Sequence, residues 1–266
     1  MVAAKPETVE DYQKWLLKAG YVKSWPVEKS YYTNTTEVMR RQFAGSAIWT
    51  QLIDALPVYD QEYLVQTGYP LLLAGSLQPA VQIKPFDSFL LKTFRRNVLD
   101  NPNWEEPPSG GWLLPDSWYS PVGDVIRTVV AVKYLDGVEF LIGKIKSLCG
   151  TLGAGCVVEM EAREEGYYAA HIDLVHEVEI PTRTWTTAPL ELHVELQVTT
   201  QLQEVIRQML HRYYERARVQ SPKTPREVWQ WDYKSEEFLA GYLGHILHYL
   251  EGMIMEVRDR QTKEAL

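Results

Sequence analysis

The clearest pattern in the chain lies between Leu190 and Arg218, where the spacing of the apolar residues changes. From 192 to 198 apolar and polar residues alternate, which predicts a β-strand with one face against a core. The apolar face consists of Leu192, Val194, Leu196 and Val198, and the polar face of His193, Glu195, Gln197 and Thr199. From Leu202 onward the apolar residues recur at helical spacing, so we expect a helix directly after this strand.

The first 78 residues predict three helices. Thr8 is a candidate N-cap for the first helix, which would end at Gly20. The segment 34–37 (NTTE) has the form of a capping box and is expected to open a longer helix that ends near Leu56. A third, short helix is expected from Asp60 to Thr67, before Gly68.

The middle of the chain mixes both periods. Short strands are expected at 80–83, 127–134, 155–161 and 167–177, and helices from Phe86 and over 136–149. Residues 101–121 are rich in Pro, Gly and Trp and predict a loop that packs down on the protein. A last amphipathic helix is expected over 235–260. This order predicts an α+β fold, a mixed β-sheet flanked by helices. We divide it into an N-terminal helical layer (1–78), a core (79–220) and a C-terminal helical extension (221–266) of a single domain.

Composition narrows the class of protein. The 266 residues carry a formal net charge of −8, which argues against DNA binding and generic nucleic-acid binding, so any contact with RNA needs a local basic patch. No apolar run reaches the length of a membrane span, and the first residues lack the apolar stretch of a signal peptide. The two cysteines, Cys149 and Cys156, are expected to be reduced thiols. We therefore expect a cytoplasmic protein.

Three further segments carry candidate chemistry beside Glu195. Asp124 stands just before a buried strand, with Arg127 in its first turn, an arrangement suited to holding magnesium on phosphates. Tyr167 and His171 share a strand face, on which the tyrosine ring could stack on a base. The helix after Pro85 carries a basic stripe beside a hydroxyl, formed by Ser88, Lys92, Arg95 and Arg96, with Lys84 just upstream. Taken one by one, each could also be a turn cap, a core residue or a solvated face.

In chain order, these segments resemble four motifs of the RelA/SpoT-type nucleotidyltransferase domain, over about Val81 to Arg218. The segment QIKPFDSFLLK is similar to R-x-K-x-x-x-S-x-x-x-K, GDVIRTVV to the magnesium-aspartate motif, GYYAAH to G-Y-x-x-x-H, and VELQVTT to E-x-Q-x-R-T. The resemblance implies a nucleotidyltransferase fold and an ATP-dependent pyrophosphokinase that needs Mg²⁺.

The resemblance also implies roles for individual residues. Asp124 and Glu195 would be the catalytic residues and metal ligands, and Glu195 would accept or orient the proton of the attacking hydroxyl. The acceptor would lie against Tyr167, His171 and Gln197. ATP would be bound by Lys84, Ser88, Lys92, Arg95 and Arg127.

The departures from the family motifs point to the acceptor. Gln82, Tyr168 and Thr199 stand where arginines are expected in members that make guanosine nucleotides. At these positions the chain therefore lacks guanidinium groups, which donate two parallel hydrogen bonds to a phosphate or to a guanine edge. In this respect the chain resembles the toxic small alarmone synthetases of toxin–antitoxin pairs. That likeness implies pyrophosphate transfer to the 3′-OH of the terminal adenosine of tRNA (the 3′ CCA end), a block of aminoacylation and translation, and a cognate antitoxin protein. Candidate RNA contacts are Arg212, Arg216, Arg218 and Lys223.

Two other functions stay open at this point. One is an alarmone synthetase that makes (p)ppGpp or (p)ppApp. The other is an inactive binding module with the same fold, against which the presence of both Asp124 and Glu195 argues.

Overall fold

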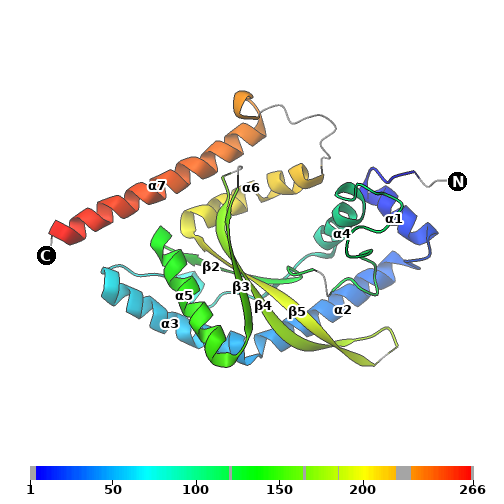
Figure 1. The fold of residues 1–266 in the computed structure, drawn as a ribbon, viewed down its shortest axis with the longest axis horizontal. Helices are drawn as coiled ribbons and strands as arrows, with labels where there is room; N and C mark the ends of the chain where they lie inside the picture. Colours follow the sequence, from blue (N-terminus) through cyan, green and yellow to red (C-terminus); the bar gives the residue numbers. More distant parts are fainter. Residues whose placement is uncertain (1–3, 120–121, 164–165, 185, 220–228, 265–266) are drawn as a thin grey trace. The chain divides into compact units, whose positions relative to one another are not determined.

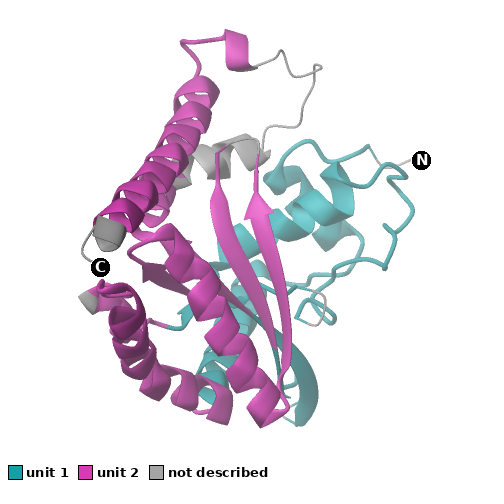
Figure 2. Ribbon diagram, turned by 60° about the vertical axis from the view of Figure 1, so that its left-hand side comes forward, with its two compact units in different colours: residues 1–44, 81–127, 175–194 teal, residues 45–80, 128–174, 195–266 magenta. Residues whose placement is uncertain are grey.

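The computed structural model describes residues 4–119, 122–163, 166–184, 186–219 and 229–264, with the side chains of 74, 211–219, 229 and 262–264 outside that description. The described residues form two compact units that alternate along the sequence (Figure 2). Unit 1 is drawn from 1–44, 81–127 and 175–194, and unit 2 from 45–80, 128–174 and 195–266. Each unit is described by itself below.

The elements follow one another in the order expected for an α+β protein (Figure 1). The N-terminal helices are α1 (Val9–Lys18), α2 (Trp25–Ala44) and α3 (Ala47–Thr67). Then come a 3₁₀ turn η1 (Ala74–Leu77), β1 (Gln82–Ile83), α4 (Phe86–Phe94), a π-helical turn η2 (Arg95–Leu99), β2 (Ile126–Val132) and α5 (Leu135–Leu152). The chain continues with β3 (Gly155–Ala162), β4 (Tyr168–Pro181), β5 (Thr187–Thr200), α6 (Gln201–Val219), the short turn η3 (Trp229–Trp231) and α7 (Glu236–Glu264).

The strands form one mixed five-stranded sheet in the order β1-β2-β5-β4-β3, which confirms the predicted fold class. β1 pairs antiparallel with β2, with Gln82 opposite Arg127. The strand predicted at 192–198 is the C-terminal half of β5, and the helix predicted after it begins at Gln201 without an intervening loop. The burial along β5 alternates as predicted, with Leu192, Val194, Leu196 and Val198 fully buried. The division into a helical layer, a core and an extension stays a prediction.

The prediction of a helix start at 34–37 was wrong. These residues lie inside α2, which begins nine residues earlier at Trp25 with Pro26 in its first turn, a position that suits proline because its nitrogen needs no hydrogen-bond partner there. The hydroxyl of Thr36 donates to the carbonyl oxygen of Tyr32 (2.8 Å), as threonine does in a helix interior. The real cap is Ser46, whose Oγ accepts from the backbone N–H of Trp49 (3.3 Å) and starts α3. α3 then continues through Pro57, so the two helices expected before and after that proline are one helix.

Each unit has its own apolar core. In unit 1, α1 and α2 both pack against α4, and the buried rings include Tyr12, Tyr32, Phe89 and Phe94. The loop predicted at 101–121 packs down in this unit, because the Trp104 and Trp112 rings lie 5.1 and 5.4 Å from Trp15 and Trp118 is fully buried. In unit 2, α3 packs along α5 (Figure 1). Within the described ranges, no helix has both the length and the apolar character to cross a membrane.

Candidate active site

Two lysines bind one carboxylate in unit 1, and the charge of an arginine acts on one of these lysines. Asp124 lies in the turn directly before β2, and its two oxygens accept hydrogen bonds from Lys84 Nζ (2.6 Å) and Lys92 Nζ (2.8 Å). Lys84 follows β1, where its backbone N–H bonds the carbonyl of Val125, and Lys92 lies on α4. Arg127 is the third cation, in β2. We call Lys84, Lys92, Asp124 and Arg127 the Asp124 cluster.

The Asp124 cluster is charged although it is largely buried. Burial acts to raise the pKa of Asp124, but the positive charges of Lys84 and Lys92 outweigh this effect and lower the pKa to about 2. The Lys84 side chain is only 8% exposed, and burial lowers its pKa despite the neighbouring carboxylate. The charges of Lys92 and Arg127 lower it further. Three cations against one anion leave an excess of positive charge, which is suited to a polyanion such as a triphosphate.

The remaining residues predicted to bind ATP lie on the same stretch of chain. Ser88 is on α4, one helical turn before Lys92. Arg95 begins η2, and its guanidinium forms an ion pair with the carboxylate of Asp100 at 3.8 Å. Tyr32 was not predicted as a site residue. Its hydroxyl donates to the carbonyl oxygen of Lys84 (2.8 Å) and so supports the backbone that carries the buried lysine.

The chemistry of Asp124 fits a magnesium ligand. Its low pKa keeps the carboxylate ionised, and oxygen is the ligand that Mg²⁺ prefers. Among the described residues there is no group of three or more Asp, Glu, His or Cys side chains that could hold a metal by themselves. A magnesium ion here would therefore depend on Asp124 together with substrate phosphates, which is the common arrangement for Mg²⁺ at nucleotide sites.

A second cluster lies in unit 2, on β4, on β5 and at the residue just before β4. Glu195 Oε1 lies 2.9 Å from His171 Nδ1, and Glu195 Oε2 accepts a hydrogen bond from Gln197 Nε2 (2.8 Å). The other ring nitrogen of His171, Nε2, lies 3.2 Å from the hydroxyl of Tyr167. Tyr167, His171, Glu195 and Gln197 were all predicted as site residues, and the structure joins them in one hydrogen-bonded chain. We call them the Glu195 cluster.

The hydrogen bonds of the Glu195 cluster determine which ring nitrogen of His171 carries the proton. A carboxylate only accepts hydrogen bonds, so Nδ1 of His171 donates to Glu195. In the neutral ring Nε2 then accepts from the hydroxyl of Tyr167. Burial acts to lower the pKa of His171, but the hydrogen bond and charge of Glu195 outweigh it and raise the pKa above its ordinary value. Burial also raises the pKa of Tyr167, and the charges of Glu161 and Glu195 add to this effect. Tyr167 is therefore a neutral phenol with an apolar ring.

Sequence reasoning missed two side chains in contact with this cluster. Glu161, on β3, lies 3.5 Å from Nε2 of His171, and the Arg163 guanidinium sits 5.5 Å from the centre of the Tyr167 ring. Arg163 also pairs with Glu161 (2.7 Å). The available signal was weak, because Glu161 alternates with Glu159 along β3 like any solvated strand face. Only the pairing of the strands shows that Glu161 reaches His171.

Two of the positions without the expected arginine make internal contacts instead. Thr199 is 3% exposed, and its hydroxyl donates to the carbonyl oxygen of Tyr168 (3.1 Å). The ring of Tyr168 stacks on His248 of α7, with centroids 3.7 Å apart, and its hydroxyl lies 2.8 Å from His245 Nδ1. Both side chains therefore hold unit 2 together. The third position, Gln82, is exposed on β1.

The predicted RNA contacts fall outside the description. The side chains of Arg212, Arg216 and Arg218 lie within 211–219, and Lys223 lies within 220–228. The neighbouring Arg207 is described and forms two hydrogen bonds with Glu204, both 2.7 Å long. This pairing raises the pKa of Arg207.

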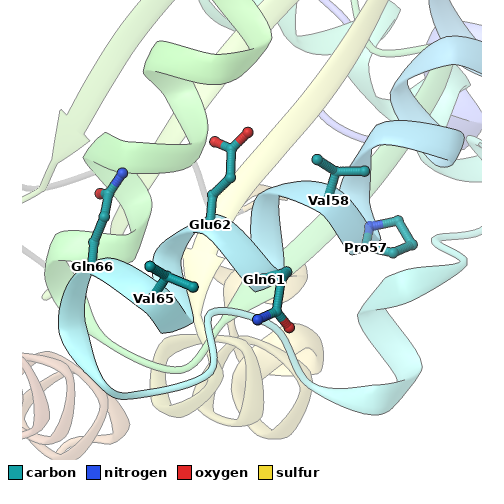
Figure 3. Close-up of a pocket in the computed structure, with 6 residues that line it drawn as sticks. All are labelled: Pro57, Val58, Gln61, Glu62, Val65 and Gln66. Carbon is teal, nitrogen blue, oxygen red and sulfur yellow. The ribbon is translucent and has the colours of Figure 1, made fainter.

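A shallow surface pocket lies elsewhere, along one side of α3 (Figure 3). It is lined by Pro57, Val58, Gln61, Glu62, Val65 and Gln66. Glu62 pairs with Lys144 of α5, and the other five side chains offer no acid, base or nucleophile. None of the predicted site residues lines this pocket, so we do not assign the site to it.

Comparison with solved structures identifies the fold. Small alarmone synthetase 1 from Bacillus subtilis bound to its product pppGpp matches with a TM-score of 0.51 and 15% identity, over 85% of this chain and 95% of that one. The chain has the fold of a small alarmone synthetase. A GTP pyrophosphokinase family protein from Streptococcus pneumoniae matches at TM-score 0.49 and 14% identity, over 90% and 95% of the two chains. Small alarmone synthetase 2 from B. subtilis matches with a TM-score of 0.46 and 12% identity, over 89% of this chain and 99% of that one.

At these identities the comparison shows the fold and not the substrate. No protein-family model matches the chain, and no curated protein sequence matches it either. The predicted resemblance to the RelA/SpoT-type domain is thus confirmed for the fold, and the assignment to the toxic subgroup stays a prediction.

Proposed function

We propose that this protein is an ATP-dependent pyrophosphokinase that transfers pyrophosphate to the 3′-OH of the terminal adenosine of tRNA. The proposal rests first on the Glu195 cluster, a fixed carboxylate joined through His171 to an aromatic ring. Such a cluster can bind a base and receive a proton from a hydroxyl. The Asp124 cluster and the fold support the same reaction class.

The Asp124 cluster would bind the triphosphate of ATP. Lys84, Lys92 and Arg127 would neutralise the phosphate oxygens, and Ser88 and Arg95 would add contacts from α4 and η2. Lysines that bond Asp124 in the free protein can turn to phosphate once substrate is bound, because ammonium groups form hydrogen bonds in several directions. A magnesium ion held by Asp124 would supply further charge neutralisation on the phosphates.

The Glu195 cluster would bind and activate the acceptor. The adenine ring would stack on Tyr167, and the attacking hydroxyl would give its proton to Glu195. The oxygen of that hydroxyl forms a bond to the β-phosphorus of ATP, the bond from this phosphorus to the α–β bridging oxygen breaks, and AMP leaves. His171 and Gln197 each hold one oxygen of Glu195, so the carboxylate is oriented before the acceptor arrives.

The contacts of Thr199 and Tyr168 support tRNA over a guanosine nucleotide. Both side chains are committed to contacts within unit 2, so neither offers the forked, charged donor that would grip a free nucleotide's phosphates or a guanine edge. An acceptor on tRNA needs fewer contacts at its last nucleotide, because phosphates further along the RNA can bind basic residues. Arg212, Arg216, Arg218 and Lys223 are the proposed residues, and the toxicity of such an enzyme would call for an antitoxin protein.

The second candidate is synthesis of an alarmone from a free nucleotide. The observation that favours it is the ligand in a solved structure with this fold, small alarmone synthetase 1 bound to its product pppGpp. In this case Tyr167 would stack on the base of a free nucleotide, and the transfer step would be the same.

A labelling experiment separates these functions. Purified protein is incubated with γ-labelled ATP and magnesium, and receives deacylated tRNA, GTP or GDP, or no acceptor. Transfer of pyrophosphate carries the label to the acceptor, so we expect labelled tRNA. Label in a guanosine or adenosine nucleotide alone would establish the second candidate and end the first. No labelled product with any acceptor would indicate an inactive binding module.

The matched variants are Glu195→Gln and Gln197→Glu. Glu195→Gln keeps the size of the side chain and removes the base, so labelling is expected to fall by at least about 100-fold. Gln197→Glu leaves Glu195 in place but sets two carboxylates side by side, and we expect a smaller loss that is greatest at high pH. Expression of the wild-type chain should arrest growth, and expression of Glu195→Gln should not.

A further inference from the structure

The long helix α7 (Glu236–Glu264) packs against α5 and α6 with its polar side (Figure 1). Its two buried charged residues, Glu251 and Arg258, are 5% and 7% exposed. Glu251 bonds the hydroxyl of Thr200 at the end of β5, and Arg258 bonds Asp136 of α5. The helix is therefore anchored both beside the strand that carries the catalytic carboxylate and, about two turns further along, on α5.

The N-terminal half of α7 touches the chain directly before Tyr167. The backbone of Gly166 has a φ of +74°, and a methyl group on this residue would lie 2.5 Å from the carbonyl oxygen of Gly241. Gly244 is so close that a Cβ atom on it would collide with the carbonyl group of Gly166. Glycine is needed on both sides of this contact because no side chain fits between the two backbones.

The residue directly after Tyr167 is held by the same helix. The ring of Tyr168 stacks on the ring of His248, with centroids 3.7 Å apart and planes inclined by 8°. The hydroxyl of Tyr168 lies 2.8 Å from Nδ1 of His245. Burial lowers the pKa of His248, and the charge of His245 lowers it further, so the His248 ring is neutral at neutral pH. A neutral imidazole can lie flat on a phenol ring without the cost of burying a charge.

Tyr167 is thus held on both sides along the chain, although its own ring faces away from α7. Side chains of extended backbone alternate, so Tyr168 faces α7 while Tyr167 lies against His171 on the other face. The same stretch is closed by a turn, in which the N–H of Arg163 donates to the carbonyl of Tyr167 (3.0 Å) and the N–H of Gly166 to that of Arg163 (2.9 Å). A shift of α7 would move this turn, and the Tyr167 ring with it.

We propose that α7 positions the ring of Tyr167 for the acceptor, through the Tyr168–His248 stack and the contact of Gly166 with Gly244. His248 is then a positioning residue, which acts through Tyr168 and does not touch the acceptor. The inference rests on the proposed function in one respect, that Tyr167 binds the base of the acceptor. A displaced ring stacks less well on a base, so acceptor binding is expected to weaken, while the ATP-binding residues of the Asp124 cluster belong to unit 1.

The test compares the kinetics of full-length variants with the acceptor that the labelling experiment identifies. His248→Ala removes the ring that lies on Tyr168 and is expected to raise KM for the acceptor at least about fivefold, with KM for ATP within about twofold of the wild type. His248→Phe keeps a flat ring and should return KM for the acceptor to within about twofold of the wild type. Tyr168→Phe loses only the hydroxyl beside His245 and should raise KM by about two- to threefold, which also tests the proposal if His248→Ala does not fold.

The control for a general loss of stability is Arg258→Met. This change frees the same helix from Asp136 and leaves the contacts of Gly166 and Tyr168 in place. It should lower the melting temperature by several degrees and leave KM for the acceptor unchanged. A wild-type KM in His248→Ala would overturn the proposal, and so would equal increases of KM in His248→Ala and Arg258→Met.

Hydrogen exchange tests the positioning of the turn without any reaction. In His248→Ala the amides of Arg163 and Gly166 should exchange at least about tenfold faster than in the wild type, and in Arg258→Met they should exchange at the wild-type rate. Unchanged exchange of these amides in His248→Ala would overturn the proposal, even if acceptor binding is weakened. If the wild type labels no acceptor, the proposed function fails, and the exchange rates alone decide whether α7 positions Tyr167.

Discussion

Replacing Asp124 with asparagine should destabilise the protein as well as stop the reaction. Asp124 is 19% exposed, and its pKa falls from 3.8 to about 2 because of Lys84 and Lys92. This shift corresponds to roughly 2–3 kcal/mol of folding free energy at pH 7. The loss in Asp124→Asn should be about 3 kcal/mol, because the Lys84 ammonium is then left buried without its anion.

The pH dependence of the unfolding free energy gives the contribution of Asp124 to stability independently. A carboxyl group whose pKa is lower in the folded state stabilises the protein fully above its unfolded pKa, near 4. That stabilisation is lost as the pH falls through the folded value of about 2. The difference in unfolding free energy between the wild type and Asp124→Asn should therefore be constant from about pH 5 to 7 and narrow below pH 4. Urea denaturation at a series of pH values measures it.

Two further variants show whether the buried ammonium group of Lys84 causes the loss of stability in Asp124→Asn. Lys84→Met removes the charge and keeps an unbranched side chain, so adding it to Asp124→Asn should recover about 1–3 kcal/mol of the loss. Lys92 is 40% exposed, and Lys92→Met should cost less than about 1 kcal/mol. If Asp124→Asn is as stable as the wild type at pH 7, or if Lys84→Met brings no recovery in the double variant, our account of the Asp124 cluster is wrong.

Three shorter predictions concern unit 2. The pKa of His171, followed by NMR, should lie above 6.5 and should drop in Glu195→Gln. The charged His171 stabilises the folded protein fully below pH 6.5, and this stabilisation is lost as the pH rises through the higher pKa of the folded state. Gly166→Ala should lower the melting temperature by several degrees, because φ at Gly166 is +74° and the new methyl group would meet backbone atoms of α7. The control is Gly143→Ala in α5, which has open space around it and should be neutral or stabilising. Tyr167→Phe should keep most of the affinity for the acceptor and Tyr167→Ala should lose at least about tenfold, measured as KM, if the ring stacks on a base. Equal effects of the two changes would place the role of Tyr167 in its hydroxyl.

Local patterns in the sequence predicted the parts of the site that depend on one strand or one helix. The alternation along β5 placed Glu195 and Gln197 on a common face, and the structure confirms that they bond each other. Asp124 was predicted just before a buried strand, and it lies in the turn before β2. For Glu195 and Gln197 the period of the strand alone decides on which face the side chains lie.

The features that sequence reasoning missed depend on contacts between elements. Glu161 reaches His171 only because β3 lies next to β4, which no pattern along β3 indicates. The error at Asn34 has the same origin. A polar residue that caps a helix and one that lies inside a helix look alike in sequence, and the packing of α2 decides between them. For α7 the spacing predicted a helix, but it could not indicate that the polar side faces the protein.

The proposed reaction is transfer of pyrophosphate to the 3′-OH of the last adenosine of tRNA. The most direct measurement compares three tRNAs that end in adenosine, 2′-deoxyadenosine or 3′-deoxyadenosine, each incubated with γ-labelled ATP, magnesium and the wild-type protein. Our account predicts label on the first two tRNAs and none on the third. Label on the 3′-deoxy tRNA at the rate of the native one, or no label on any tRNA while a free nucleotide becomes labelled, would contradict it.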